Sequence, residues 1–159
     1  MTELCKFVDI CIANEEDAKD VFGIEASNSD IYGGKLSRKG YQEVAAELVR
    51  RFHFQSVAIT LRTSLSASDN EWAGLLYDGK QFWTSPQYSL HIVDRVGGGD
   101  SFCGGLIYSL LHEMSPQDAI NFAAAASALK QSIEGDFNRV TVDEVMKLAG
   151  GDASGRVQR

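Results

Sequence analysis

Three consecutive glycines followed by an aspartate are the residues in this sequence whose types and spacing best suit chemistry. Gly97, Gly98 and Gly99 permit a tight bend, and Asp100 follows at the start of a helix-like run. Backbone N–H groups at a helix start have no partner inside the helix, and together with the positive end of the helix dipole they form an anion site. A carboxylate in that first turn can serve as base for a hydroxyl that attacks a phosphate.

The same residues are also compatible with a plain connection between a strand and a helix, because aspartate is common at helix N-termini. On the local pattern alone, both interpretations stay open. Two other phosphate-binding patterns are excluded. A dinucleotide fingerprint needs G-x-G-x-x-G, and Phe102 stands at the third glycine. A P-loop needs G-x-x-x-x-G-K-[ST], and the sequence contains no such string.

The composition favours one globular domain with an acidic surface. The chain has 159 residues and a formal net charge of -7, and no basic cluster interrupts the acidity. Nucleic acids and anionic membranes are therefore not expected as partners. The three cysteines form no Cys-x-x-Cys pair, and no signal or membrane-length apolar run is present, which predicts a cytoplasmic protein. The three histidines lack metal-ligand spacing.

Hydrophobic periodicity predicts strands that alternate with helices. Strands are expected at residues 7–13, 56–61, 72–77, 81–84 and 88–93, with a two-residue hairpin turn at Asp78 and Gly79. Helices are expected from Asn14, over 41–52, from the three glycines to about His112, from Ser115 with Pro116, and from Thr141. Loops are expected at 25–39 and 62–70. Residues 1–149 are predicted to form the domain, and residues 150–159 a loosely ordered tail.

This order of elements predicts an α/β fold with a largely parallel sheet and one hairpin. In such sheets, ligands bind beyond the carboxyl ends of the strands. Asn14, the segment after Leu61 and the glycines after Val93 all follow predicted strands. Their expected convergence favours a phosphate ligand over a plain connection.

The stretch Asp94–Phe102 resembles the C-terminal signature of the ribokinase-like (PfkB) sugar kinases, whose usual form is D-T-x-G-A-G-D-x-F. Within that family the 2-keto-3-deoxygluconate kinases are most similar, on the segments 59–62, 66–70, 135–138 and 151–156. The resemblance implies part of a three-layer α/β/α sandwich with a mostly parallel sheet and a β-hairpin. It implies a carbohydrate kinase that phosphorylates 2-keto-3-deoxy-D-gluconate to its 6-phosphate, with ATP and Mg²⁺.

The resemblance also implies roles for individual residues. Asp100 would be the general base for the sugar hydroxyl, and the backbone N–H groups of Gly97, Gly98 and Gly99 would form the anion hole. The positions implied to border the nucleotide are Asn14, Thr60, Arg62, Ser64, Gly99 and Ala124. Asn14 matches the family's N-x-x-E motif, which is linked to Mg²⁺ and phosphate.

Several positions depart from the family pattern. Asp17 stands where the N-x-x-E motif has glutamate, so its shorter side chain weakens an indirect metal role. Arg95 replaces the usual threonine of the signature, and it is expected either to pair with a carboxylate or to face substrate. Family members can bind a monovalent cation near Asp94 and Val96. Lys130 falls close to other positions of that site, which argues against a bound K⁺.

The resemblance covers nearly all of this chain but only the second half of a family member. A fragment, a truncated product or half of a split protein is therefore expected, with an exposed sheet edge or apolar face that favours a homo-oligomer. One alternative is a catalytically silent module that binds nucleotide or self-associates. Another is a kinase of the same family that acts on fructose, ribose or a nucleoside.

Overall fold

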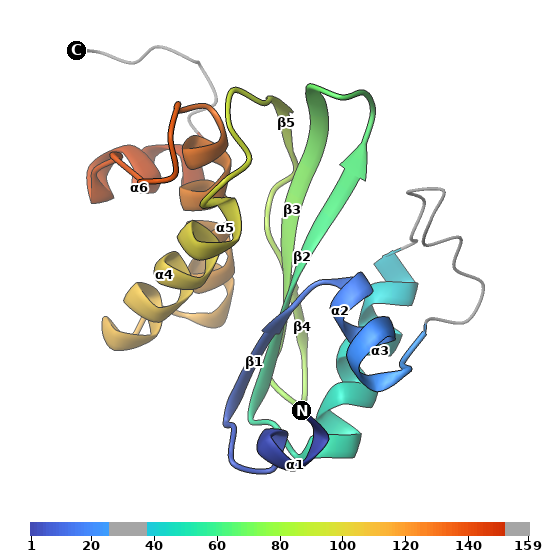
Figure 1. The fold of residues 1–159 in the computed structure, drawn as a ribbon. Helices are drawn as coiled ribbons and strands as arrows, with labels where there is room; N and C mark the ends of the chain where they lie inside the picture. Colours follow the sequence, from blue (N-terminus) through green and yellow to red (C-terminus); the bar gives the residue numbers. More distant parts are fainter. Residues whose placement is uncertain (26–37, 152–159) are drawn as a thin grey trace.

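A mixed β-sheet with helices on both faces makes up the fold in the computed structural model, which describes residues 1–25 and 38–151 (Figure 1). The strands are β1 (Ile10–Ala13), β2 (Ser56–Ser64), β3 (Asp69–Tyr77), β4 (Phe82–Thr84) and β5 (Tyr88–His91). They are ordered β1-β2-β3-β4, and β5 pairs with the other half of β3. Most of the expected loop at 25–39 and all but two residues of the expected tail lie outside the described residues.

The predicted α/β fold is confirmed, and so is the hairpin between β3 and β4. The pairing differs from the expected largely parallel sheet. Only β1 and β2 are parallel, whereas β3 is antiparallel to β2, β4 and β5 in the described part of the chain. Short connections cause this difference, because neighbouring strands joined by a few residues can only run in opposite directions.

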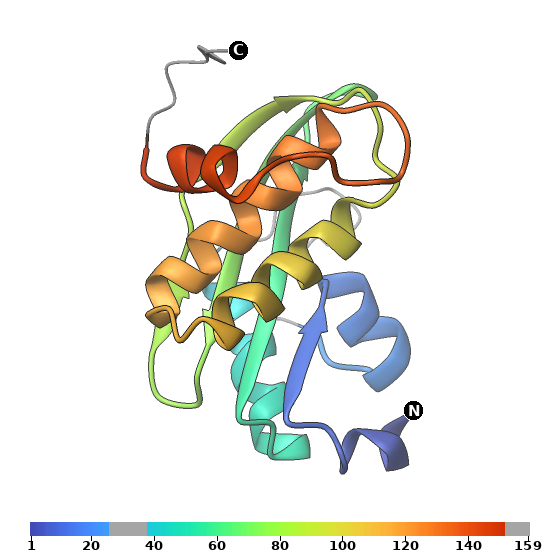
Figure 2. The same cartoon turned by 90° about the vertical axis from the view of Figure 1, so that its left-hand side faces the viewer.

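Helices form the two outer layers. α2 (Glu15–Phe22) and α3 (Arg38–Phe52) cover one face, and α4 (Gly98–Leu111) and α5 (Pro116–Gln131) cover the other. Figure 2 shows α4 and α5 side by side across the sheet, and α6 (Val142–Ala149) lies against α5. A four-residue helix, α1 (Thr2–Cys5), precedes β1. Among the described residues, no helix is both long and apolar enough to cross a bilayer.

The helix starts follow from capping residues that the sequence revealed. The side chain of Ser115 accepts a hydrogen bond from the Asp118 N–H, and Pro116 occupies the first turn of α5. Thr141 and Glu144 form the predicted capping box of α6. The end of α4 near His112 is also confirmed.

Several strand limits differ from the expectation. The strand expected at 7–13 begins only at Ile10, and it is not buried, because β1 is an edge strand that pairs with β2 alone in the described residues. Phe7, before it, is 86% exposed. The loop expected at 62–70 shrinks to residues 65–68, since β2 and β3 pair out to Ser64 and Asn70.

The remaining differences are local. α3 begins at Arg38, before the apolar pattern that starts at Tyr41. β5 ends at His91, two residues before the expected end. The hairpin loop is longer than two residues, because the Asp78 carboxylate accepts from the N–H groups of both Lys80 and Gln81 and so shapes the turn.

Candidate functional site

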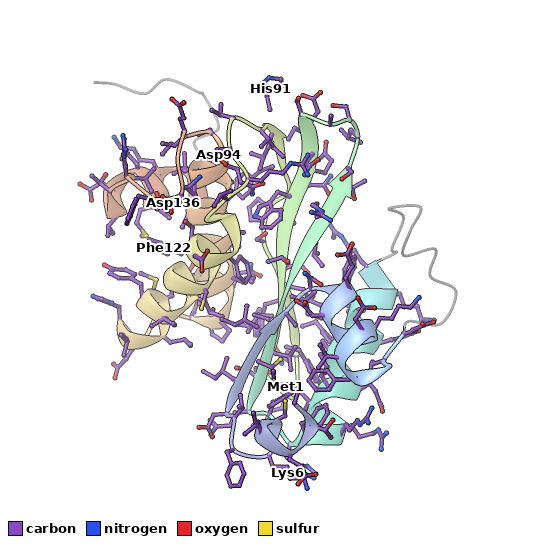
Figure 3. The ribbon with its side chains drawn as sticks, in the orientation of Figure 1. Met1, Lys6, His91, Asp94, Phe122 and Asp136 are labelled. Atoms are coloured by element: carbon purple, nitrogen blue, oxygen red, sulfur yellow. The ribbon has the colours of Figure 1, made fainter. Side chains whose placement is uncertain are left out.

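The bend before α4 needs glycine at its first position. Gly97 has φ of 79°, and a Cβ there would collide with the carbonyl oxygen of Asp136. Figure 3 shows Asp136 and Asp94 beside the start of α4. From the other side, the Ser127 hydroxyl on α5 donates to the Gly98 carbonyl at 2.7 Å. Contacts from α5 and from the loop around residue 136 therefore fix the shape of the bend.

The bend leaves backbone donors available to a ligand. Gly98 N–H donates to the Arg95 carbonyl at 3.2 Å, so it is engaged within the chain. The N–H groups of Gly99 and Asp100 have no backbone acceptor among the described residues. Nothing lies within 4 Å of a Cβ built at Gly99, so this face of the first turn is open. The available anion donors are thus Gly99 and Asp100, the second of which the sequence interpretation missed.

A polar pocket of about 220 Å³ lies between the starts of α2 and α4, with β2 and β3 beneath it. The residues that line it are Asn14, Glu16, Thr60, Arg62, Asn70, Trp72, Arg95, Gly98, Gly99 and Gln131. The expected convergence of Asn14, the end of β2 and the three glycines is therefore confirmed. Sequence reasoning gave no site role to Glu16, Asn70, Trp72 or Gln131, although Asn70 ends the segment 66–70 that resembles the family.

The charges around this polar pocket favour an anion. Arg62 lies 3.7 Å from the Glu16 carboxylate and stays partly exposed. Arg95 donates to the Ala67 carbonyl at 2.7 Å, which holds the β2–β3 turn against the bend. The two arginines outnumber the single acid, and the starts of α2 and α4 add the positive ends of two helix dipoles.

A second, more apolar groove of about 550 Å³ runs along α4, α5 and α6. Gly97 and Asp100 line this apolar groove, whereas Gly98 and Gly99 line the polar pocket. The bend therefore separates the groove from the pocket. The apolar side chains that line it are Val96, Phe122, Ala126, Phe137, Val140, Val142 and Val145. Figure 3 shows Phe122 among the α4, α5 and α6 helices. None of these groove residues was predicted, although residues 135–138 did match the family.

Three predicted site residues line neither hollow. Ala124 is fully buried in the core between α5 and the sheet, and Ala126 lines the apolar groove instead. Ser64 lies at the exposed end of β2, opposite Asn70. Asp17 lies in the first turn of α2, outside the polar pocket.

Asn14 and Asp17 cap α2. The Asn14 side-chain oxygen accepts from the Asp17 N–H at 2.7 Å, and one Asp17 carboxylate oxygen accepts from the Asn14 N–H at 3.1 Å. Within the described residues, no three acidic, histidine or cysteine side chains are grouped to hold a metal ion. Asn14 lines the polar pocket with its side-chain oxygen engaged in the cap, and Asp17 lies outside the pocket, so Asn14 could meet a phosphate-bound metal ion only through water.

Lys130 is a fully buried cation beneath the bend. Its Nζ donates to the carbonyls of Asp94 and Ile133, at 3.4 and 3.3 Å. The Asp94 carboxylate accepts from the N–H groups of Val96 and Gly135, both at 3.0 Å. The pKa of Asp94 is lowered mainly by the hydrogen bond from the Val96 N–H, and further by the Gly135 N–H and the nearby Lys130 charge.

The three cysteines are free thiols. Cys103 is half-buried one turn into α4. Burial raises the pKa of Cys11 to about 11, with smaller contributions from Cys5 and Asp17.

Comparisons with known proteins find both sequence and fold similarity. A family model described as pfkB family carbohydrate kinase matches residues 1–138. A solved 2-dehydro-3-deoxygluconokinase from Thermotoga maritima is 44% identical with a TM-score of 0.86, over 94% of this chain and 43% of that protein. A PfkB family carbohydrate kinase from Listeria grayi is 32% identical with a TM-score of 0.76, over 93% of this chain and 43% of that protein.

A curated relative shows the same partial coverage. The 2-dehydro-3-deoxygalactonokinase of Haloferax volcanii is 29% identical over 147 residues, which are 92% of this chain and 40% of the relative. The chain thus spans less than half the length of each of these three proteins.

Proposed function

Since this chain belongs to the pfkB family of carbohydrate kinases, we propose that it forms the nucleotide-binding and phosphoryl-transfer part of an ATP-dependent sugar kinase. The observation that carries the proposal is the bend before α4. It presents the N–H groups of Gly99 and Asp100 with the Asp100 carboxylate in the same turn. An anion site and a base within one turn are what transfer of a phosphoryl group to a hydroxyl requires.

The nucleotide would span the bend. The apolar groove suits a nucleobase, because aromatic and aliphatic side chains line it. The polar pocket suits the phosphate chain, with Asn14, Thr60 and Arg62 on its walls. Ser64 and Ala124 are left out of this arrangement, since neither lines the pocket or the groove.

The transfer step follows from this placement. Asp100 takes the proton of the acceptor's primary hydroxyl, and the hydroxyl oxygen bonds to the γ-phosphorus of ATP. The bond from that phosphorus to the bridging oxygen breaks, and ADP leaves with the electron pair. Gly99 and Asp100 donate N–H groups to the phosphoryl oxygens, and Gly97 and Gly98 hold the bend in shape. Mg²⁺ bound to the phosphates would neutralise part of their charge, with Asn14 contacting its water, whereas the predicted indirect role of Asp17 finds no support because Asp17 lies outside the polar pocket.

We infer 2-keto-3-deoxy-D-gluconate as the acceptor. Two relatives carry names of 2-dehydro-3-deoxy sugar kinases, one of them 44% identical. Arg95 lies at the rim of the polar pocket, where its charge can meet the carboxylate of a sugar acid. Fructose, ribose and a nucleoside are the competing acceptors, and a panel of these compounds separates them.

A second candidate is a silent module that binds nucleotide or self-associates in the cytoplasm. The open edge of β1 favours it, because β1 pairs only with β2 among the described residues. Phe7, Val8 and Ile10 beside that edge are exposed. An unpaired strand with apolar neighbours favours pairing with a second copy, which predicts a homo-oligomer.

The test is ADP release from Mg-ATP by the purified chain, with and without the sugar acid. Sugar-dependent release supports the kinase, and release should fall at least about 100-fold in Asp100→Asn with unchanged nucleotide affinity. Asp20→Asn, on the exposed side of α2, is the matched control. Near-normal turnover in Asp100→Asn would overturn the base assignment. Saturable Mg-ATP binding without any release would favour the silent module.

A further inference from the structure

The side chain of Asn70 is buried without a hydrogen-bond partner. Asn70 is 1% exposed, and neither its Nδ2 nor its Oδ1 has a partner among the described residues. A buried polar group left unpaired destabilises the fold, and such groups are rare in native structures. Asn70 lines the polar pocket, so a ligand there can supply the missing partners.

The neighbours of Asn70 place a set of unpaired donors on one wall. Residues two apart in a strand share a face, so Asn70 and Trp72 of β3 point the same way. Trp72 lies opposite Arg62 in the β2–β3 register, which puts the arginine on the same face. The Trp72 Nε1–H is also buried without a partner in the described part of the chain. One wall of the polar pocket therefore carries two N–H donors without partners, the Asn70 amide and the Trp72 indole, beside the Arg62 guanidinium.

The chemistry of this wall specifies its ligand. Arg62 and Arg95, with the open Gly99 N–H across the pocket, call for an oxyanion. The Oδ1 of Asn70 needs a donor, which the water around a hydrated oxyanion provides. A pocket of about 220 Å³ is too small for a whole nucleotide and suits a chain of phosphates.

We propose that Asn70 is a binding residue for the terminal phosphates of a nucleoside polyphosphate. Its Nδ2 donates to a phosphoryl oxygen, and its Oδ1 accepts from a water that hydrates the phosphates. This assignment rests on the proposed function, because it takes the nucleotide as the ligand of the polar pocket. A carboxylate of the sugar acid offers the same oxyanion chemistry, so the test includes both sources.

The test uses Asn70→Leu, which keeps the side-chain size and removes both unpaired atoms. Calorimetric titrations with the Mg²⁺ forms of AMP, ADP and ATP, and with 2-keto-3-deoxygluconate, are paired with thermal unfolding without ligand. We expect at least about tenfold weaker binding of ADP and ATP with AMP binding unchanged. We also expect a higher melting temperature in the absence of ligand, because the variant no longer buries an unpaired amide.

Weaker binding of ADP and ATP together with a higher melting temperature is expected only if the Asn70 amide binds a ligand. A lower melting temperature with unchanged ATP binding would overturn the proposal, since it would show a structural amide bound to an ordered water. Weakened binding of the sugar acid alone would overturn the nucleotide assignment. Asn121→Leu on α5, where Asn121 already pairs with Gln117, should change neither nucleotide affinity nor its dependence on phosphate number. A wild-type chain that binds no nucleotide refutes the proposed function, and the Asn70 assignment to phosphates falls with it.

Discussion

Replacement of Gly97 by alanine should destabilise the fold more than any other glycine substitution in the bend. Its φ of 79° costs an alanine about 1–2 kcal/mol. The added Cβ also collides with the Asp136 carbonyl oxygen, and displacing that backbone adds about 1–3 kcal/mol. The sum is roughly 2–5 kcal/mol, which lowers the melting temperature by roughly 5–15 °C in a chain of this size.

Two other glycines separate strain from collision in Gly97→Ala. Gly23 has φ of 65° with nothing within 4 Å of a built Cβ, so Gly23→Ala introduces backbone strain without a collision. Gly99→Ala meets neither penalty and should be neutral or up to about 1 kcal/mol stabilising, as alanine favours the helix. Urea unfolding followed by circular dichroism measures all three. Equal effects of Gly97→Ala and Gly23→Ala would refute the argument that residues around 136 hold the bend.

Three further predictions concern the surroundings of the bend. Ser127→Ala removes the buried hydroxyl that donates to the Gly98 carbonyl in the first turn of α4, and should lower the unfolding free energy by about 0.5–1.5 kcal/mol in urea titrations, because one buried hydrogen bond is lost. The Asp94 pKa is lowered from 3.8 by the Val96 and Gly135 N–H groups, so its contribution to stability is present above pH 3.8 and is lost as the pH falls through the lower folded value. Asp94→Asn should therefore be less stable at pH 7 and lose less stability on acidification, as melting curves between pH 2 and pH 7 will show (roughly the window of carboxyl titration). With a pKa of about 11, Cys11 is on the order of one-thousandth thiolate at pH 8, so iodoacetamide should label it slowly in the folded chain by mass spectrometry.

Each of these predictions has a result that contradicts it. An unchanged unfolding free energy in Ser127→Ala would mean that the hydrogen bond from Ser127 to Gly98 adds no net stability, and Ser132→Ala, on an exposed hydroxyl, is the matched control. Identical acid unfolding curves for Asp94→Asn and wild type would remove the hydrogen-bonded carboxylate from the acid response. Rapid labelling of native Cys11 at pH 8, as fast as in urea, would contradict its burial.

The sequence predicted best where a local pattern determines the structure. The caps at Ser115 and Thr141, and the three glycines, act within a few residues of themselves, so their positions can be read without knowing the rest of the chain. Pairing between distant segments was harder to predict. Serines have low strand propensity, and only pairing with Asn70 and its neighbours keeps residues up to Ser64 in β2.

The candidate site divides in the same way. The family signature located the bend and Asp100, but it could not distinguish the two sides of α5. Ala124 faces the sheet and Ala126 faces the apolar groove, and a run of alanines has no hydrophobic periodicity that separates them. Asn70 was missed for a related reason. Asparagine in a sequence indicates a turn or surface position, so the burial of the Asn70 amide in a strand could be found only from the structure.

The burial of Lys130 has a consequence for how the molecule responds to ionic strength. Dissolved ions screen exposed charges over about 8 Å at 0.15 M salt, whereas a buried charge is screened much less. Arg62 and Arg95 are exposed, and the Lys130 ammonium beneath the bend is not. Added salt should therefore weaken the attraction of the two exposed arginines for an anion more than the attraction of the buried Lys130. The Asp94 carboxylate offsets part of the Lys130 charge, so only a small attraction for anions should remain at the bend at salt concentrations that screen Arg62 and Arg95.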